Sequence, residues 1–362
     1  MSTLYRLDVR DTSGVLQAQV TDFTSLAYTK TVNTPGILQF GVRGDHDLLT
    51  TLADKWQIEV WRKLDGQAWY RDFVGMYRSG NWQFTDKSKF VAYCPGLMSI
   101  LGWRIVAWKA NSVNRSTFVN AKAETIAKTL VTYNATSSAT TGNGRLRDGA
   151  ISGLSVAADS AGGNTLDWNC AFDNLLETLQ KLALVAGGDF DLVKTSSAAW
   201  QFRWYAGQLG TDRTSEIVFA LERGNMSAPN YTDSKIEEKT AAIVGGQGEE
   251  SARVFAVRTG ANYNITTNNI ELFVNATNAN TTAALNTQGD QKLADVQAKT
   301  KFSFKGVRTP STIYGVHFFL GDLVTAINPF NWTSQTVKVK SVSVSIDSNG
   351  AETIEPEFEE VA

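Results

Sequence analysis

The side chains best suited to catalysis or metal binding are few in this sequence, and they are scattered along it. His46 and His317 are the two near-neutral proton carriers, and neither has a partner at metal-ligand spacing or a nucleophile motif beside it. The two cysteines, Cys94 and Cys170, lie outside any Cys-x-x-Cys pair or histidine cluster. We therefore expect both thiols to be buried apolar residues in a reducing compartment, with no metal site and no cofactor.

A glycine-rich turn and a group of carboxylates are the remaining candidates for chemistry. The Gly245–Gly248 segment (GGQG) resembles a phosphate-binding loop, but it lacks the Lys-Ser/Thr of a P-loop and the helix that a dinucleotide site needs. A turn at a strand end is its better interpretation. Paired carboxylates can hydrolyse glycosides, and the candidates here are Asp233, Glu237, Glu238, Glu249 and Glu250. Such acids are mostly solvated surface charges, so a hydrolase is the weaker alternative and we assign no catalytic residue.

Length and composition indicate a chain of several globular units. The 362 residues exceed the ~250 that one hydrophobic core usually serves, so two or three domains are expected. A net charge of −2 provides no basic field for binding nucleic acid. The N-terminus lacks a basic stretch followed by an apolar run, and nowhere do about 18 apolar residues follow one another. We expect neither a signal peptide nor a direct membrane anchor.

Alternating apolar and polar residues predict many short strands in the first unit, residues 1–110. The pattern predicts a hairpin over residues 4–20 and further strands over residues 25–31, 36–42, 57–62, 68–77, 80–85 and 89–93. Regular turns between them, such as Asn33–Gly36, are typical of a sandwich or barrel. Four tryptophans lie in or beside these strands: Trp56, Trp61, Trp69 and Trp82. They favour aromatic core packing over a sugar-stacking platform.

The pattern changes in residues 111–213 and changes back in residues 214–362. The middle unit has helical periodicity over residues 121–131 and 172–186, a polar loop at Asn134–Gly144, and strands over 189–193 and 200–204, which predict two helices on a small sheet. The last unit has strand patterns over residues 241–244, 252–258, 270–275, 314–319, 323–327, 336–345 and 352–360, with one helix within 281–299. The predicted fold is mainly β, with two β units that flank a smaller α+β domain.

Several local patterns follow one another in an order that resembles a known family. The segments that carry the resemblance are Val20–Tyr28, Asn33–Gly36, Leu38–Val42, Phe73–Tyr77, Ala92–Ile105, Phe172–Leu182, Leu320–Val324, Val337–Ile346 and Glu355–Phe358. They comprise a strand, a Pro-Gly turn and a strand, then an aromatic and glycine segment, a middle helix, a Gly-Asp-x-Val strand and a final hairpin. In this order they resemble the siphophage tail hub proteins, a family related in architecture to the baseplate hubs of contractile-tailed phages.

The resemblance implies a homotrimer in which two tube-protein-like β-barrels per chain form a six-fold-like ring. That ring continues the tail tube, with the middle domain on its outside. The implied partners are the tail tube and distal tail proteins, the tape-measure protein, and tail-tip or fibre proteins, while DNA passes through the channel without specific binding. The implied location is the tail tip of the virion, assembled in the bacterial host cytoplasm. No peptidase, lysozyme or fibre domain follows Val361, so we expect receptor cutting to belong to other proteins.

A glycan- or receptor-binding tail module is the alternative function. It is motivated by the ten tryptophans and by the polar loops Asn134–Gly144 and Asn275–Asn280. The structural interpretation instead requires large, partly apolar contacts through strand edges and loops, because obligate interfaces bury roughly 2,000 Å² or more. The sequence does not identify the residues that form them.

Overall fold

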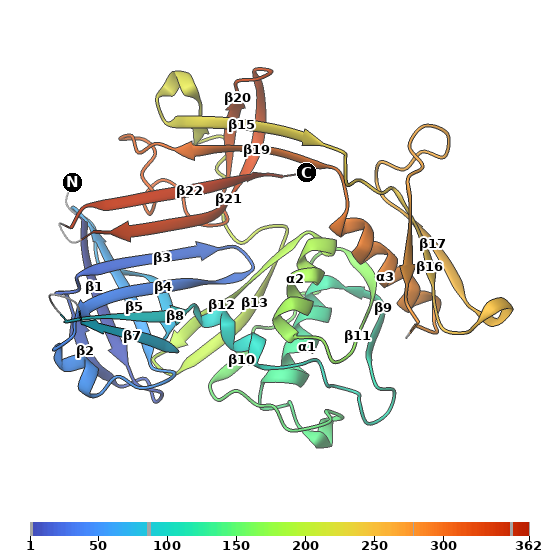
Figure 1. Ribbon diagram of the computed structural model, residues 1–362, viewed down its shortest axis with the longest axis horizontal. Coiled ribbons are helices and arrows are strands. Elements are labelled where there is room, and N and C mark those ends of the chain that lie inside the picture. The colour runs from blue at the N-terminus through green and yellow to red at the C-terminus, as the bar shows by residue number, and fades with distance from the viewer. Residues whose placement is uncertain (1–2, 85–87, 278, 348–349, 362) are drawn as a thin grey trace.

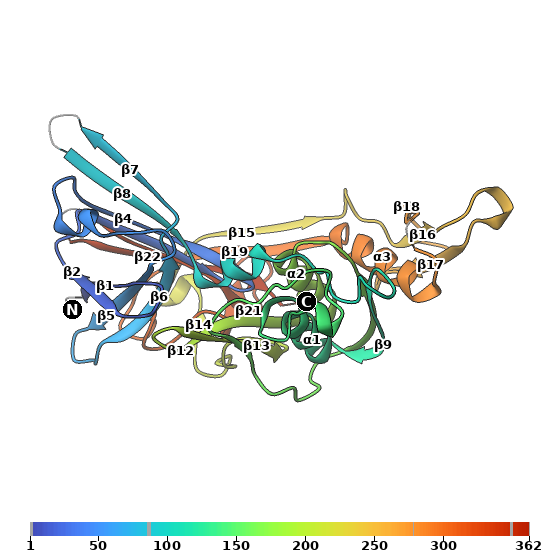
Figure 2. The same cartoon turned by 90° about the horizontal axis from the view of Figure 1, so that it is seen from below.

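The computed structural model describes residues 3–84, 88–277, 279–347 and 350–361. The fold is mainly β, with three α-helices among these residues. Figure 1 shows the N-terminal strands at one end, α1 and α2 in the middle, the C-terminal strands across the top, and a small β unit with α3 at the other end. In Figure 2 the β7–β8 hairpin projects from one end of the elongated molecule, and the unit of β16, β17 and β18 extends from the other.

The N-terminal unit consists of two antiparallel groups of strands. One sheet has the order β2-β1-β5-β6, formed by β1 (Thr3–Arg10), β2 (Leu16–Val20), β5 (Gln57–Leu64) and β6 (Tyr70–Met76). The second group is β3 (Ser25–Thr31), β4 (Thr34–Arg43), β7 (Ser79–Phe84) and β8 (Ser88–Pro95). Alternation places Leu7 and Val9 of β1 in the core and leaves Leu4 exposed. The predicted hairpin and strands of this unit are confirmed, except that residue 85 of the strand predicted over 80–85 lies outside the described residues.

The C-terminal strands continue the sheet of the N-terminal unit. The added strands are β14 (Val218–Phe219), β20 (Leu323–Asn328), β21 (Thr333–Ile346) and β22 (Glu352–Glu360). The order is β14-β20-β21-β3-β4-β8-β7, with β22 on the other edge of β21. The first half of β21 pairs with β20 and its second half with β3, as in the pair Val344 and Tyr28. Two separate barrels are not shown, because β21 is long enough to join both units and the described strands close no sheet.

One hydrophobic core serves both β units. Leu26 and Leu38 of the N-terminal unit belong to the same cluster as an aromatic group from the C-terminal unit. That group comprises Phe219, Phe302, Phe304, Phe318 and Phe358. Two of its members lie on β19 (Lys299–Gly306), which pairs with β15 (Met226–Ser234) and runs beside β22. The sequence pattern predicted neither β15 nor β19.

The predicted strand over residues 314–319 is wrong. Gly315 adopts a left-handed φ of +84°, and the amide of His317 donates to the carbonyl of Ile313 at 2.9 Å, so the chain turns here. Tyr314 and Phe318 are nevertheless buried in the shared core. Val316 and Phe319 are 38% and 40% exposed, so the apolar pattern indicated burial for part of this segment and did not indicate its backbone conformation.

The middle unit packs two helices against a small sheet, as predicted. Its elements are β9 (Ser116–Lys122), α1 (Ala123–Ala135), β10 (Leu154–Val156), β11 (Thr165–Cys170), α2 (Leu175–Ala186), β12 (Gly188–Ser196) and β13 (Ala199–Ala206). Ile126, Leu179 and Phe190 are among its fully buried residues. Leu97 and Leu101 of the first unit share this core, so the division at residue 110 stays a prediction.

Two local predictions in the middle unit are wrong. Asn134 does not begin an exposed loop, since it lies in α1 and is fully buried. Its buried Oδ1 accepts hydrogen bonds from the amides of Ala107 and Trp108 at 2.8 and 3.1 Å. Phe172 does not lie on the buried face of α2. It is 49% exposed with a φ of +58°, and the helix begins later, after the Asn174 cap.

A third, smaller core lies at the far end of the molecule. The helix α3 (Thr282–Asp295) covers one face of the sheet β17-β16-β18, formed by β16 (Ala241–Gly245), β17 (Phe255–Thr259) and β18 (Glu271–Asn275). Gly245 ends β16, so the glycine-rich segment is a strand-end turn, as interpreted. Short 3-10 helices complete the chain: η1 (Asp47–Thr50), η2 (Leu97–Trp103), η3 (Thr141–Asn143), η4 (Leu221–Arg223) and η5 (Glu250–Ala252).

Candidate functional site

Both histidines form local structural hydrogen bonds. The Nδ1 atom of His46 caps η1 by accepting from the amide of Leu48 at 3.0 Å, and its Nε2 lies 3.2 Å from Asp22. The Nδ1 atom of His317 accepts from the amide of Ile313 at 2.9 Å. Within the described ranges, no group of three or more His, Cys, Asp or Glu side chains is placed to hold a metal ion. The same residues include no helix long and apolar enough to cross a membrane.

The five candidate carboxylates lie on three separate segments of the chain. Asp233 is on β15, and Glu249 and Glu250 lie at η5; all three are exposed, as is Glu237. Glu238 is buried, where its Oε1 accepts from the Nδ2 of Asn262 at 2.9 Å. This placement fits solvated or structurally bonded acids.

The two cysteines lie in different cores. Cys94 belongs to the shared core of the β units and Cys170 to the middle core, and both are free thiols. Burial raises the pKa of both thiols, that of Cys170 to about 12. Because the thiolate is the reactive form, neither sulfur is an activated nucleophile at neutral pH.

The tryptophans differ in exposure. Trp56 packs against the shared core, and the guanidinium of Arg6 stacks over the half-buried Trp61 and Trp69, 5.5 and 5.0 Å from their ring centroids. Trp82 is 55% exposed, so the prediction of core packing is wrong for this residue.

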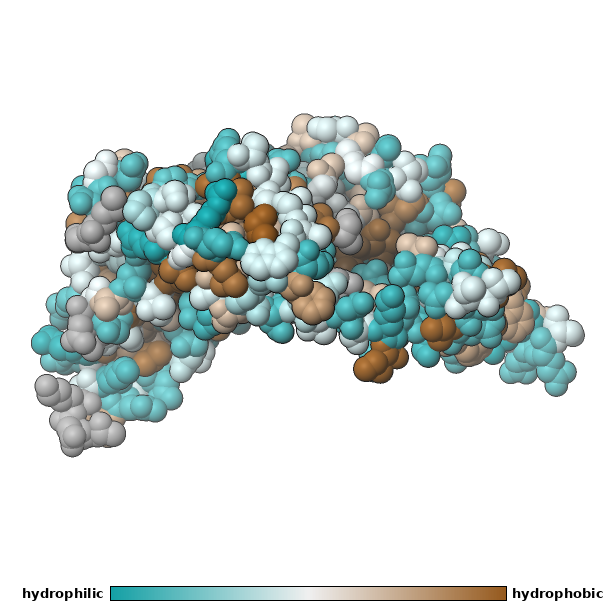
Figure 3. All heavy atoms as spheres, turned by 90° about the horizontal axis from the view of Figure 1, so that it is seen from above, coloured by the Kyte–Doolittle hydropathy of each residue, from teal (hydrophilic) through white to brown (hydrophobic). Residues whose placement is uncertain are grey.

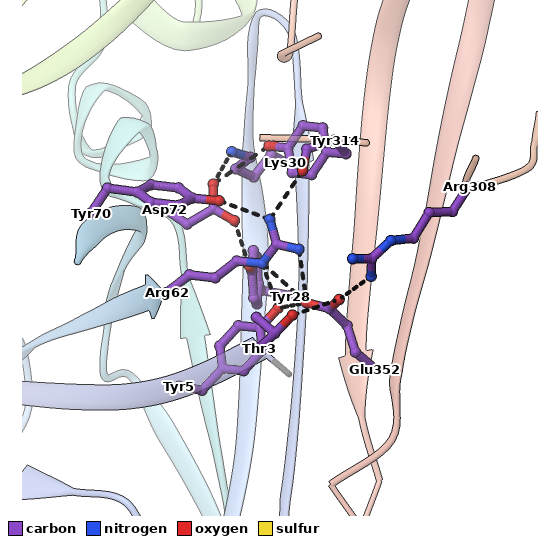
Figure 4. A network of polar contacts seen from close by, with 10 residues as sticks. All are labelled: Thr3, Tyr5, Tyr28, Lys30, Arg62, Tyr70, Asp72, Arg308, Tyr314 and Glu352. Carbon is purple, nitrogen blue, oxygen red and sulfur yellow. Dashed lines mark hydrogen bonds and ion pairs between the residues drawn. The ribbon is translucent and has the colours of Figure 1, made fainter. Parts of the chain in front are cut away.

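A buried network of polar side chains joins the N-terminal strands to the C-terminal ones (Figure 4). Its centre is Arg62 on β5, which is fully buried and donates from Nη2 to Oε1 of Glu352 on β22 at 2.8 Å. The same guanidinium donates to the hydroxyls of Tyr5 and Tyr70, both at 2.8 Å, and to the carbonyl of Tyr314 at 3.2 Å. Burial would lower the pKa of Arg62, but Tyr5, Tyr70 and Glu352 raise it, so the cation is firmly held.

A second carboxylate extends this network toward β3. Asp72, whose side chain is 3% exposed, accepts hydrogen bonds from Lys30 and from the hydroxyl of Tyr28. The hydroxyl of Tyr314 lies 3.4 Å from the same carboxylate. The network thus pairs the buried Arg62 with Glu352 and the part-buried Lys30 with Asp72, and Arg308 also contacts Glu352 at 3.4 Å. Each carboxylate in it therefore has a cation beside it.

Acid is expected to weaken the network through Asp72. Burial alone would raise the pKa of Asp72, but the charge of Lys30 and the hydroxyl of Tyr28 hold it below its usual value. The resulting stability is therefore present above the unfolded-state pKa of about 4 and is lost as the pH falls through the folded-state pKa. We expect the unfolding free energy of the wild type to fall more steeply between about pH 5 and pH 2 than that of Asp72→Asn, measured by urea denaturation. Asp54→Asn, at an exposed acid, is the control and should keep the pH dependence of the wild type. An equal fall of the unfolding free energy with pH in the wild type and in Asp72→Asn would contradict the role of Asp72.

A second buried ion cluster fixes the middle unit against the first sheet. The Nζ atom of Lys194 on β12 lies 2.7 Å from Oε1 of Glu59 on β5, and both side chains are almost fully buried. Arg10 and Arg71 also contact Glu59, at 3.2 and 3.6 Å. Burial would raise the pKa of Glu59, but Lys194 and the other donors lower it. These contacts hold the middle unit to the first sheet.

The Asn33 turn between β3 and β4 provides a third connection. Asn33 has a left-handed φ of +61°; its Oδ1 accepts from the amide of Phe190 at 2.8 Å and its Nδ2 donates to Asp189 at 3.1 Å. Asp189 also pairs with Lys338 of β21 at 2.9 Å. The three units therefore meet at Asp189.

Large apolar side chains are exposed on the parts of the molecule that project most. Every residue of the edge strand β7 is exposed, and its Trp82 and Phe84 stack with ring centroids 6.3 Å apart. The turn between β20 and β21 exposes Phe330 and Trp332. The sheet face opposite α3 exposes Phe255, Val257 and Phe273. The space-filling view shows an arched molecule, hollowed between the projection of β7 and β8 and that of β16 to β18 (Figure 3).

Comparison with known proteins identifies the class. The profile of the family described as Siphovirus ReqiPepy6 Gp37-like protein matches residues 6–358, so the chain belongs to this siphovirus tail protein family. No match was found among curated proteins.

Solved phage tail proteins share the fold. A 43 kDa tail protein of prophage MuSo2 from Shewanella oneidensis is 14% identical, with 99% of this chain and 98% of that chain covered and a TM-score of 0.57. A tail protein from Neisseria meningitidis MC58 is 13% identical, with 98% and 96% covered and a TM-score of 0.56. A chain of the half-lidded Francisella PdpA–VgrG complex is 8% identical, with 99% and 58% covered and a TM-score of 0.52. At these identities the similarity concerns the fold, and the predicted resemblance to tail hub proteins is confirmed.

Proposed function

We propose that this chain is a non-enzymatic structural component of a phage tail tip. Three copies form a ring that connects the tail tube to the distal tip and surrounds the channel for DNA and the tape-measure protein. Each copy contributes its first and last β units, residues 1–110 and 214–362, to the ring, and the middle unit lies on the outside. Tail tube, distal tail and tail-tip or fibre proteins are the neighbours in the virion.

The observation that carries this proposal is the exposure of aromatic side chains on an edge strand at one end of an arched molecule. Monomeric proteins rarely leave such apolar groups in water, and an unpaired edge strand readily accepts another chain. Trp82 and Phe84 on β7 are 55% and 69% exposed, so burying them requires a partner. Family membership and the shared tail-protein fold support the same assignment.

Replacing both aromatic residues of β7 should weaken assembly and leave the fold intact. We expect the Trp82→Gln/Phe84→Gln variant to lose about 2 kcal/mol or more of the association free energy of the trimer. Because the half-assembly concentration of a trimer scales as the square root of its dissociation constant, that concentration should rise about fivefold or more. Sedimentation equilibrium measures that concentration, and circular dichroism checks the fold. Val119→Thr is the matched control, because Val119 is 67% exposed on β9 of the middle unit. Assembly that is unchanged in the double variant would contradict the proposed contact.

A further inference from the structure

Three arginines at the boundary between the first and middle units line a cavity of about 360 Å³. Arg104 follows η2, whereas Arg145 and Arg147 belong to the segment between α1 and β10, at the lower edge of Figure 1 and away from β15 and β19. In the part of the chain with defined coordinates, no carboxylate forms an ion pair with any of the three. Asp148 also lines the cavity, but its Oδ1 accepts from the amide of Thr141 at 2.7 Å.

Backbone carbonyls hold two of these guanidinium groups in place. Arg104 donates to the carbonyls of Gly149 and Ala150 at 2.5 and 3.1 Å, and Arg145 donates to that of Ile105 at 3.1 Å. A Cβ at position 149 would lie 2.6 Å from Cζ of Arg145, so glycine leaves the space that this guanidinium occupies. The cationic groups are thus organised before any ligand arrives, which reduces the entropy cost of binding.

The charge of this arginine cluster is incompletely satisfied. Arg145 is 4% exposed, and its Nε is buried without a hydrogen-bond partner among the described atoms. Burial and the neighbouring arginines lower the pKa of both Arg104 and Arg145, although Asp148 partly offsets this for Arg145. An anion in the cavity would accept hydrogen bonds and neutralise the repulsion.

The rim of the cavity favours a protein carboxylate over a phosphate. Trp103, Ile105 and Leu146 line the same cavity and are 37%, 47% and 58% exposed. Protein interfaces are enriched in tryptophan and arginine, and their strongest contacts place a charged group within an apolar surround. Nucleic acid requires a longer basic track, and a free phosphate ion would leave the apolar rim uncovered.

We propose that this cavity binds an Asp or Glu side chain, flanked by apolar residues, from a partner protein. The carboxylate accepts from the arginine cluster, and the flanking residues cover Trp103, Ile105 and Leu146. This site lies where the first and middle units meet and depends on neither the trimer nor the channel.

Two capped peptides test the proposal by isothermal titration calorimetry on the full chain. One is acetyl-Leu-Glu-Glu-Leu-amide and the other carries Gln in place of both Glu residues. We expect the acidic peptide to bind at least about tenfold more tightly than the neutral one, because the carboxylate supplies the charged contact. Arg147 is exposed, so the Arg147→Gln variant should fold normally. It should lower the affinity for the acidic peptide by a similar factor. Arg43→Gln, at an exposed arginine of the first unit, should leave it unchanged.

Three results would overturn the proposal. The first is equal affinity for the two peptides. The second is no detectable binding of the acidic peptide to the folded chain. The third is binding of inorganic phosphate without binding of the acidic peptide, which would assign the cluster to a phosphate group instead.

Discussion

Arg62→Met is expected to lower the free energy of unfolding by about 3–5 kcal/mol. The substitution removes the cation at the centre of the network. It leaves the carboxylate of Glu352, whose side chain is 10% exposed, with the hydroxyl of Tyr5 and the longer 3.4 Å contact to Arg308. A largely buried carboxylate that loses its closest cation costs more than the lost hydrogen bonds alone. Urea denaturation followed by circular dichroism measures the change.

Glu352→Gln tests whether this loss comes from the unpaired charge. The double variant Arg62→Met/Glu352→Gln should be more stable than the sum of the two single losses predicts. The amide of Gln is uncharged, so the double variant leaves no unpaired carboxylate at position 352. Lys63→Met, on the adjacent and less buried side chain of β5, is the control and should cost less than about 1 kcal/mol. A loss under about 1 kcal/mol for Arg62→Met would refute the role of Arg62 as the connection between the two β units.

Gly96→Ala should destabilise the first unit by about 3 kcal/mol. Gly36 and Gly96 follow the prolines of the two Pro-Gly dipeptides, and the amide of Gly96 donates to the carbonyl of Gly36 at 3.1 Å. A Cβ at Gly96 would lie 1.7 Å from the carbonyl oxygen of Pro35, so the backbone has to separate. Thermal unfolding monitored by circular dichroism reports the loss.

Gly66→Ala is the matched control for this substitution. Gly66 has a left-handed φ of +76° but no atom within 4 Å of the added Cβ, so only backbone strain of about 1 kcal/mol is expected. If Gly66→Ala and Gly96→Ala lower the stability equally, the close contact between the two Pro-Gly turns is not what excludes a side chain at position 96.

Local pattern predicted those elements whose own residues determine them. The alternation of residues 25–31 gave the bounds of β3, and the apolar spacing of α2 was correct from Leu175 onward. Asn174 could have marked the start of α2, since its Oδ1 accepts from the amides of Leu176 and Glu177. Phe172 was misplaced because helical spacing does not report the left-handed conformation that precedes the cap.

Long-range pairing was not available from the sequence. Arg62 and Glu352 are 290 residues apart, and each alone reads as an ordinary charged residue in a strand. The pairing of β21 could not be predicted from its own residues either. Its alternating valines predict a strand with one buried face, but they do not indicate that its second half pairs with β3. That pairing is why the two β units share one core instead of forming the separate barrels that were expected. The strands β15 and β19 pair with each other. The polar sequence of β15 hid this hairpin, although Phe302 and Phe304 alternate with polar residues on β19.

The most direct test of the proposed ring is electron microscopy of the purified chain combined with a measurement of its mass in solution. We expect class averages with three-fold symmetry and a central channel, and a particle built from three 39.5 kDa chains. The Trp82→Gln/Phe84→Gln variant should shift that particle toward single folded chains. A chain that remains monomeric at ~100 μM, above the dissociation constants of stable assemblies, and shows no ring would contradict the central claim.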